Sequence, residues 1–212
     1  MKALIIGATG ATGKDLLVVL LDSPDYTEVV AFVRTPLNIA HPKLSFVITD
    51  FSNLETVSSL IKGDIWFSCL GTTLKAAGSR DKQRHIDFQI PAKFADIAKR
   101  NGVSSVVLLS AYGAKVNSLL FYSMIKGALE KYIADLAFKL YIIFKPGMLL
   151  RKDTNRAGET ISVKVLKFLN GLGLIKNFRP LPTEILADKI AKAPRILSSG
   201  VHIIELEKIW EF

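Results

Sequence analysis

The feature that most constrains the fold is a glycine turn near the start of the chain. An apolar run at residues 3–6 leads into Gly7, Gly10 and Gly13, and a helical pattern begins at residue 14. A strand that ends in such a turn aims the first backbone N–H groups of the next helix at one point. The helix dipole adds roughly half a positive charge there, which suits a pyrophosphate. The pattern therefore predicts a dinucleotide-binding turn. We expect it to be formed by Gly7, Thr9, Gly10, Ala11, Thr12 and Gly13.

The composition requires either a membrane or a sheet that is covered on both faces. Hydrophobic residues make up 50% of the chain, and the mean hydropathy is +0.32. The longest early aliphatic run, at residues 16–21, is far too short to span a bilayer. Strands that are buried on both faces form continuous runs of Val, Ile and Leu. We therefore expect a buried parallel sheet, no transmembrane segment and no secretory signal.

Apolar runs alternate with helical patterns along the whole chain, which is typical of βαβ units. The expected strands lie at residues 2–6, 29–33, 44–48, 64–69, 105–109, 140–145 and 201–205. The expected helices lie at residues 14–21, 54–62, 83–100, 119–136, 160–169 and 183–197. Right-handed crossovers predict an α/β, doubly wound, mostly parallel sheet, a Rossmann fold with strand order 3-2-1-4-5-6 plus an extra C-terminal strand.

The sequence predicts one domain over residues 1–212, because no linker or repeat divides it. We expect a cofactor-binding core at residues 1–147. Residues 148–212 would form a small C-terminal substrate lid and the final strand, and would not fold independently.

Two side chains that follow expected strands are candidates for contacts with a nucleotide cofactor. Arg34 lies 21 residues after Gly13, and no acid lies between residues 29 and 38. An arginine there accommodates a 2′-phosphate, whereas an acid would bind the free ribose hydroxyl. NADP(H) is thus preferred over NAD(H), the alternative being an ordinary surface arginine. Asp50 could accept from an adenine amino group, although a capping or turn aspartate is nearly as plausible.

A second glycine turn follows the fourth expected strand. We expect Leu70, Gly71 and Thr72 to lie along the middle of the cofactor. The preceding Cys69 is the only cysteine, which excludes an intrachain disulfide and a cysteine-rich metal site. The three histidines are far apart and show no metal-binding spacing, so we expect a metal-free, cytoplasmic protein.

Three residues form a candidate catalytic set. Ser110 closes the fifth expected strand, and Tyr122 and Lys126 are one turn apart on the following helix. A lysine ammonium near a phenol favours the phenolate, so the tyrosine becomes a usable proton donor for a carbonyl. Ser110 could then donate to the substrate oxygen, and Lys126 could reach the nicotinamide ribose. A half-buried structural tyrosine is the alternative.

Together with these motifs, Lys145-Pro146-Gly147 resembles the atypical short-chain dehydrogenase/reductase superfamily. More narrowly, the segments at residues 69–73, 121–122, 126–127, 146–150 and 156–159 are similar to the family of the human Tat-interacting oxidoreductase-like protein. This resemblance implies a Rossmann domain that binds NADP(H), with Ser110, Tyr122 and Lys126 as its triad. It also implies that Pro146 and Gly147 line the nicotinamide end.

The net charge of +9 is concentrated late in the chain. Residues 139–195 contain twelve Lys or Arg and four acids. A basic surface can attract nucleic acid, anionic lipid or an acidic small molecule, but solubility and cofactor neutralisation account for it more simply. Residues 160–176 would be the lid over the substrate. Arg151 and Arg156 are our candidates for anchoring an anionic group of that substrate.

The sequence thus favours an NADPH-dependent reductase of a small-molecule carbonyl substrate, which could be anionic or acyl-like, and a monomer or homodimer. The alternative is an NADPH-binding regulatory or redox-sensor module with little turnover. Nucleic acid is not an expected partner, because no recognition motif accompanies the charge.

Overall fold

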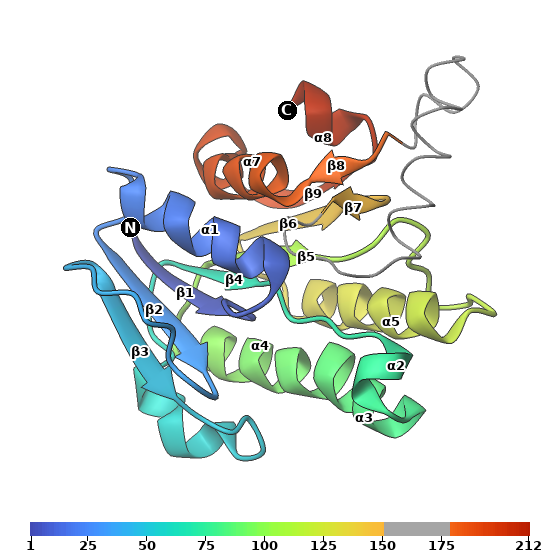
Figure 1. Ribbon diagram of the computed structural model, residues 1–212, viewed down its shortest axis with the longest axis horizontal. Coiled ribbons are helices and arrows are strands. Elements are labelled where there is room, and N and C mark those ends of the chain that lie inside the picture. Colours follow the sequence, from blue (N-terminus) through green and yellow to red (C-terminus); the bar gives the residue numbers. More distant parts are fainter. Residues whose placement is uncertain (151–178) are drawn as a thin grey trace.

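Seven parallel strands form the central sheet, with helices on both of its faces (Figure 1). The computed structural model describes residues 1–150 and 179–212. The strands are β1 (Lys2–Ile6), β2 (Glu28–Val33), β3 (Leu44–Ile48), β4 (Ile65–Ser68), β5 (Ser105–Leu109), β6 (Leu140–Lys145) and β9 (Gly200–Glu205). Their order is β3-β2-β1-β4-β5-β6-β9, so the predicted topology and the extra C-terminal strand are confirmed.

The helices divide between the two faces of this sheet. The first face carries α1 (Ala11–Asp22), α7 (Thr183–Ile196) and α8 (Lys208–Glu211). The second carries η1 (Leu54–Leu60), α4 (Ile90–Arg100) and α5 (Phe121–Asp135). Because β9 completes the same sheet as β1, we propose that the whole chain is one domain.

Two expected helices differ from those observed. The one expected at residues 54–62 is the 3₁₀ helix η1, whose serines and β-branched residues are poor helix formers. The one expected at residues 83–100 is divided into α3 (Arg80–Arg84), a π-helical turn η2 (His85–Gln89) and α4. The short helix α2 (Leu74–Ala77) precedes them. The helix expected at residues 160–169 lies outside the described residues.

A small second sheet was not expected from the sequence. It pairs β7 (Leu149–Leu150) with β8 (Leu181–Pro182) in parallel. Two residues per strand leave no periodic pattern that could predict them. Among the described residues, none of the helices combines the length and the apolar character that a bilayer crossing would require.

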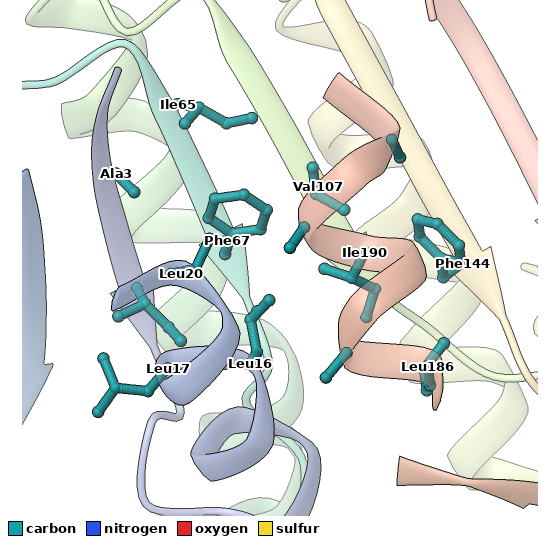
Figure 2. Packing of buried hydrophobic residues seen from close by; sticks show 14 of the residues in the cluster. Ala3, Leu16, Leu17, Leu20, Ile65, Phe67, Val107, Phe144, Leu186 and Ile190 are labelled. Atoms are coloured by element: carbon teal, nitrogen blue, oxygen red, sulfur yellow. The ribbon is translucent and has the colours of Figure 1, made fainter. Parts of the chain in front are cut away.

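The packing of α1 and α7 against the sheet holds the N-terminal turn in place. Leu16 and Leu20 of α1 belong to one buried cluster with Phe67 of β4, and the cluster also contains Ile190 of α7 and Val107 of β5 (Figure 2). All of these side chains are buried. The two helices thus form one apolar layer over the strands, which fixes the start of α1 relative to β1.

Shortening a buried side chain of α1 tests this layer. We expect Leu20→Ala to lower the free energy of unfolding by about 2–5 kcal/mol, because it removes apolar contacts and leaves a cavity. Val18 lies on the same helix but is 50% exposed, so Val18→Ala should change it by less than about 0.5 kcal/mol. Urea unfolding of both variants measures the difference, and equal losses would contradict the packing.

Candidate active site

The glycine turn joins β1 to α1 through very close backbone contacts. Gly7 has φ +83°, and a Cβ there would lie 2.5 Å from the carbonyl carbon of Cys69. A Cβ on Gly13 would lie 2.0 Å from the carbonyl oxygen of Gly7. A Cβ on Gly10 would meet only the Gly7 oxygen, at 3.4 Å, which is ordinary contact. Gly7 and Gly13 are thus required by the fold, whereas Gly10 leaves room for something outside the chain.

The start of α1 is suited to an anion. Gly10 is the N-cap, makes no side-chain capping bond, and no acid lies in the first turn. The first N–H groups of a helix have no partner within it, so a bound anion could accept from them. The Gly10 N–H itself donates to the Gly7 oxygen at 3.0 Å, which closes the turn. These features fit the diphosphate of a dinucleotide.

A cleft of about 660 Å³ lies at the carboxyl ends of the central strands, next to this turn. It is formed by the turn, the loop after β4, the end of β5 and the start of α5. The cleft brings together nine of the residues predicted to form the site, and these are Gly10, Ala11, Thr12, Leu70, Gly71, Thr72, Ser110, Tyr122 and Lys126. Its lining also includes residues that were not predicted to form the site, namely Cys69, Thr73, Leu74, Ala76, Arg80, Gln83, Leu109, Phe121 and Leu149.

A buried carboxylate supports the loop after β4. Asp87 comes from the π-helical turn η2 and accepts the Thr72 N–H at 3.0 Å through Oδ1. Gln83 donates to the Thr72 carbonyl oxygen at 3.3 Å. Burial raises the pKa of Asp87, and the nearby charge of Lys126 opposes this effect. Asp87 could not be predicted as this support, because a π turn has no periodic pattern of its own.

Lys126 is buried beneath the cleft. Its Nζ donates to the carbonyl oxygens of Leu109, at 3.1 Å, and Leu70, at 3.4 Å. Burial lowers the pKa of this lysine, and Asp87 is the largest of the charges that oppose the shift. Lys126 therefore links the loop after β4 to the end of β5, where both border the cleft.

Tyr122 stands at the mouth of the cleft. It lies one turn before Lys126 on α5, and 40% of its surface is exposed. The Arg80 guanidinium lies over the ring of the neighbouring Phe121, with its Cζ 5.3 Å from the ring centroid. Tyr122 is thus a partly exposed side chain in the lining of the cleft.

The hydroxyl of Ser110 donates to a carboxylate that the sequence analysis missed, that of Glu130. Glu130 is one turn beyond Lys126 on α5, and its Oε2 lies 3.3 Å from Nζ of Lys145. The spacing of Tyr122, Lys126 and Glu130 at every fourth residue could have identified it, since all three share one helical face.

Several predicted site residues lie outside the cleft lining. Arg34 follows β2 and is exposed, and Asp50 follows β3. Both carboxylate oxygens of Asp50 accept from Ser52, at 2.9 and 2.8 Å, which is the turn role. Pro146 is buried, and Gly147 is exposed. The predicted cofactor contacts of Thr9, Arg34, Asp50, Pro146 and Gly147 stay predictions. Arg151 and Arg156 lie outside the described residues.

Cys69 is held as a thiol. Burial raises its pKa from 9.0 to about 12, with Lys126 as the opposing charge. Because the thiolate is the reactive form, this supports packing rather than nucleophilic chemistry. Within residues 1–150 and 179–212 no group of histidines, cysteines or acids could hold a metal ion.

The parallel sheet, the glycine turn and the cleft at the strand ends define a nucleotide-binding Rossmann domain. Residues 7–167 match the NAD(P)H-binding family model, and the chain belongs to this family. It is 32% identical over 99% of its length to the mitochondrial protein FMP52 of Eremothecium gossypii, covering 96% of that protein. It is 33% identical to HTATIP2 of Rattus norvegicus, over 76% of this chain and 68% of that one. The predicted superfamily is confirmed.

Solved structures show the same fold at low sequence identity. A UDP-glucose 4-epimerase of Thermotoga maritima superposes with a TM-score of 0.73 over 97% of this chain and 76% of the epimerase, at 12% identity. MoeE5, solved with UDP-glucose and NAD, gives 0.72 at 15% identity, with coverage of 97% and 76%.

The expected cytoplasmic location is wrong. The FMP52 proteins of Eremothecium gossypii and Candida albicans, 32% and 31% identical to this chain, are both named as mitochondrial. The expectation rested on composition and the single cysteine, and neither distinguishes between compartments that keep thiols reduced.

Two alanine substitutions in the turn separate folding from binding. Gly13→Ala forces a Cβ against the Gly7 oxygen, so we expect a loss of stability of about 1–3 kcal/mol. Gly10→Ala meets only an ordinary contact, so its stability should stay within about 0.5 kcal/mol of the native value. Gly10→Ala should still weaken NADPH binding, because Gly10 lines the cleft and the added methyl group takes up space there. Urea unfolding and NADPH fluorescence measure the two effects, and unchanged binding by Gly10→Ala would contradict the assignment of the turn.

Proposed function

We propose that the protein is an NADP(H)-dependent oxidoreductase that reduces a small carbonyl compound. One observation carries this proposal: a single cleft contains the glycine turn together with Ser110, Tyr122 and Lys126. The family match supports the nicotinamide cofactor, and the choice of reaction rests on the chemistry of the three side chains. A regulatory module that binds NADPH would not need a proton donor beside a buried lysine.

The side chains have separate roles in this proposal. When bound, NADPH supplies the hydride that reduces the carbonyl carbon. Tyr122 gives its phenolic proton to the carbonyl oxygen, which completes the alcohol. Lys126 supports the phenolate that remains and, through Leu70 and Leu109, fixes the floor of the cleft. Ser110 lies beside them and contacts the substrate.

The proposal also includes the cofactor preference, the anchoring of the substrate and the cellular compartment. Arg34 would bind the 2′-phosphate of NADP(H), because it follows β2 and is exposed to a ligand. Arg151 and Arg156 would hold an anionic group of the substrate. By analogy with the FMP52 proteins, we propose that the protein functions in mitochondria.

Replacing the phenol tests the reaction. We expect Tyr122→Phe to lower kcat for NADPH-dependent carbonyl reduction by about 10²- to 10⁴-fold, because it removes the proton donor. NADPH binding should stay within about twofold, since binding does not need that proton. Oxidation of NADPH against a panel of aldehydes and ketones measures the first effect, and fluorescence titration measures the second.

Tyr112→Phe is the matched control. Tyr112 has a similar exposure, 43%, but does not belong to the described lining of the cleft. Its loss should leave turnover unchanged, and an equal loss in both variants would contradict the role of Tyr122. Native protein that binds NADPH yet reduces no carbonyl would favour the regulatory alternative.

Removing the guanidinium tests the cofactor preference. Arg34→Ala should weaken NADPH binding by about 10- to 100-fold and leave NADH binding unchanged, because a charged hydrogen bond to phosphate contributes roughly 1.5–3 kcal/mol. Arg100→Ala, which removes an exposed arginine at the end of α4, is the control. Titration of each variant with both cofactors gives the result, and tighter binding of NADH by the native protein would refute the preference.

A further inference from the structure

The hydrogen of the Ser110 hydroxyl is already committed within the protein. Ser110 is buried at the end of β5, and its Oγ donates to Oε1 of Glu130. Glu130 is the ion-pair partner of Lys145, so it is a carboxylate and can only accept hydrogen bonds. The serine oxygen therefore offers its lone pairs, and not its hydrogen, to the cleft that it lines.

Several contacts fix this arrangement. The side chains of Glu130 and Lys145 are only 13% and 12% exposed. Nζ of Lys145 also donates to the Ala114 carbonyl oxygen at 3.2 Å, which ties the loop after β5 to the end of β6. The hydroxyl of Tyr141 donates to the backbone oxygen of Glu130 at 3.3 Å. The carboxylate is thus held by Ser110 on one oxygen and by Lys145 on the other, and the contact with Ala114 fixes Lys145 in turn.

Turning the serine hydrogen toward the cleft would be unfavourable. It would break a charge-assisted hydrogen bond and leave one oxygen of a largely buried carboxylate without that donor. A ligand that accepts at Ser110 must compensate for this loss. A ligand that donates at Ser110 needs no rearrangement, because the lone pairs are already available.

We propose that Glu130 is a positioning residue that makes Ser110 a hydrogen-bond acceptor and so selects hydroxylated carbonyl substrates. The substrate hydroxyl donates to Ser110, while the neighbouring carbonyl oxygen faces Tyr122. The class of substrate is then a hydroxy-aldehyde or hydroxy-ketone and not a simple ketone. This inference rests on the proposed reduction, and it concerns only which carbonyl compounds enter the cleft.

A matched pair of substrates tests the selectivity. Hydroxyacetone and butanone differ by a hydroxyl in place of a methyl group. In the native protein we expect kcat/KM for hydroxyacetone to exceed that for butanone by about tenfold, the effect of one neutral hydrogen bond. Comparable values for the two ketones in the native protein would overturn the proposal.

We expect Glu130→Gln to change the Ser110 hydroxyl from a hydrogen-bond acceptor to a hydrogen-bond donor toward the cleft. The amide oxygen would accept from Lys145, so the amide nitrogen would face Ser110 and donate to it. The serine hydrogen then turns toward the cleft, and the preference for hydroxyacetone should fall to about twofold or less. Lys145→Arg keeps a charged donor beside Glu130 and should retain the preference. Glu28→Gln is the control. Glu28 also pairs with a lysine, but it is the first residue of β2 and so lies at the amino ends of the strands, away from the cleft.

Binding of two unreactive amides separates this inference from the proposed reaction. Glycolamide and propionamide have the same hydroxyl-for-methyl difference but are not reduced, so calorimetry reports selectivity without turnover. We expect glycolamide to bind about tenfold more tightly to the native protein, and Glu130→Gln and Ser110→Ala to remove the difference. Ser110→Ala leaves the Glu130–Lys145 pair in place should the glutamine variant fail to fold. Equal binding of both amides to the native protein, or a preference that Ser110→Ala retains, would overturn the inference even if carbonyl reduction were observed.

Discussion

The contact between the backbone of Gly7 and the start of α1 is the constraint on which the rest of the structure depends. The absence of a Cβ at Gly13 lets the helix approach the Gly7 oxygen, and the absence of one at Gly7 lets β1 approach the loop after β4. Any larger residue at either position would separate these elements. Because the contact lies at the carboxyl edge of the sheet, it also directs the open end of α1 into the cleft. These close approaches thus set both the packing and the position of the candidate anion site.

The fold could be predicted from the sequence because its determinants are local. β1, β3, β5 and β6 have the predicted bounds, since each is a short, mostly apolar run that ends at or just before a polar or glycine residue. Right-handed crossovers then restrict the possible orders of the strands, and the predicted order is the one observed. The same logic placed Ser110, Tyr122 and Lys126 in the cleft, because strand ends and helix faces follow from periodicity.

The parts that could not be predicted depend on contacts between distant segments. Helical spacing puts Glu130 on the face of Tyr122 and Lys126, but its hydrogen bond with Ser110, 20 residues away along the chain, depends on tertiary structure. Asp87 supports Thr72 from a π-helical turn that interrupts an apparently continuous helical pattern. The 3₁₀ geometry of η1 and the pairing of β7 with β8 likewise depend on tertiary structure, because the segments are too short for periodicity. The compartment is not encoded in the packing of the fold at all.

The charged groups beneath the cleft lower the stability of the fold, and the proposed function gives a reason for their presence. Burial disfavours the charged forms of both Lys126 and Asp87, and each opposes that shift in the other. Glu130 and Lys145 form a second, largely buried pair on the same side of α5. Apolar residues of similar size would stabilise such positions equally well or better. What apolar residues could not do is fix the direction of the serine hydrogen or hold an ammonium group against the ends of β4 and β5. The buried charges therefore give the cleft a defined pattern of donors and acceptors, which the proposed selection among carbonyl compounds would use.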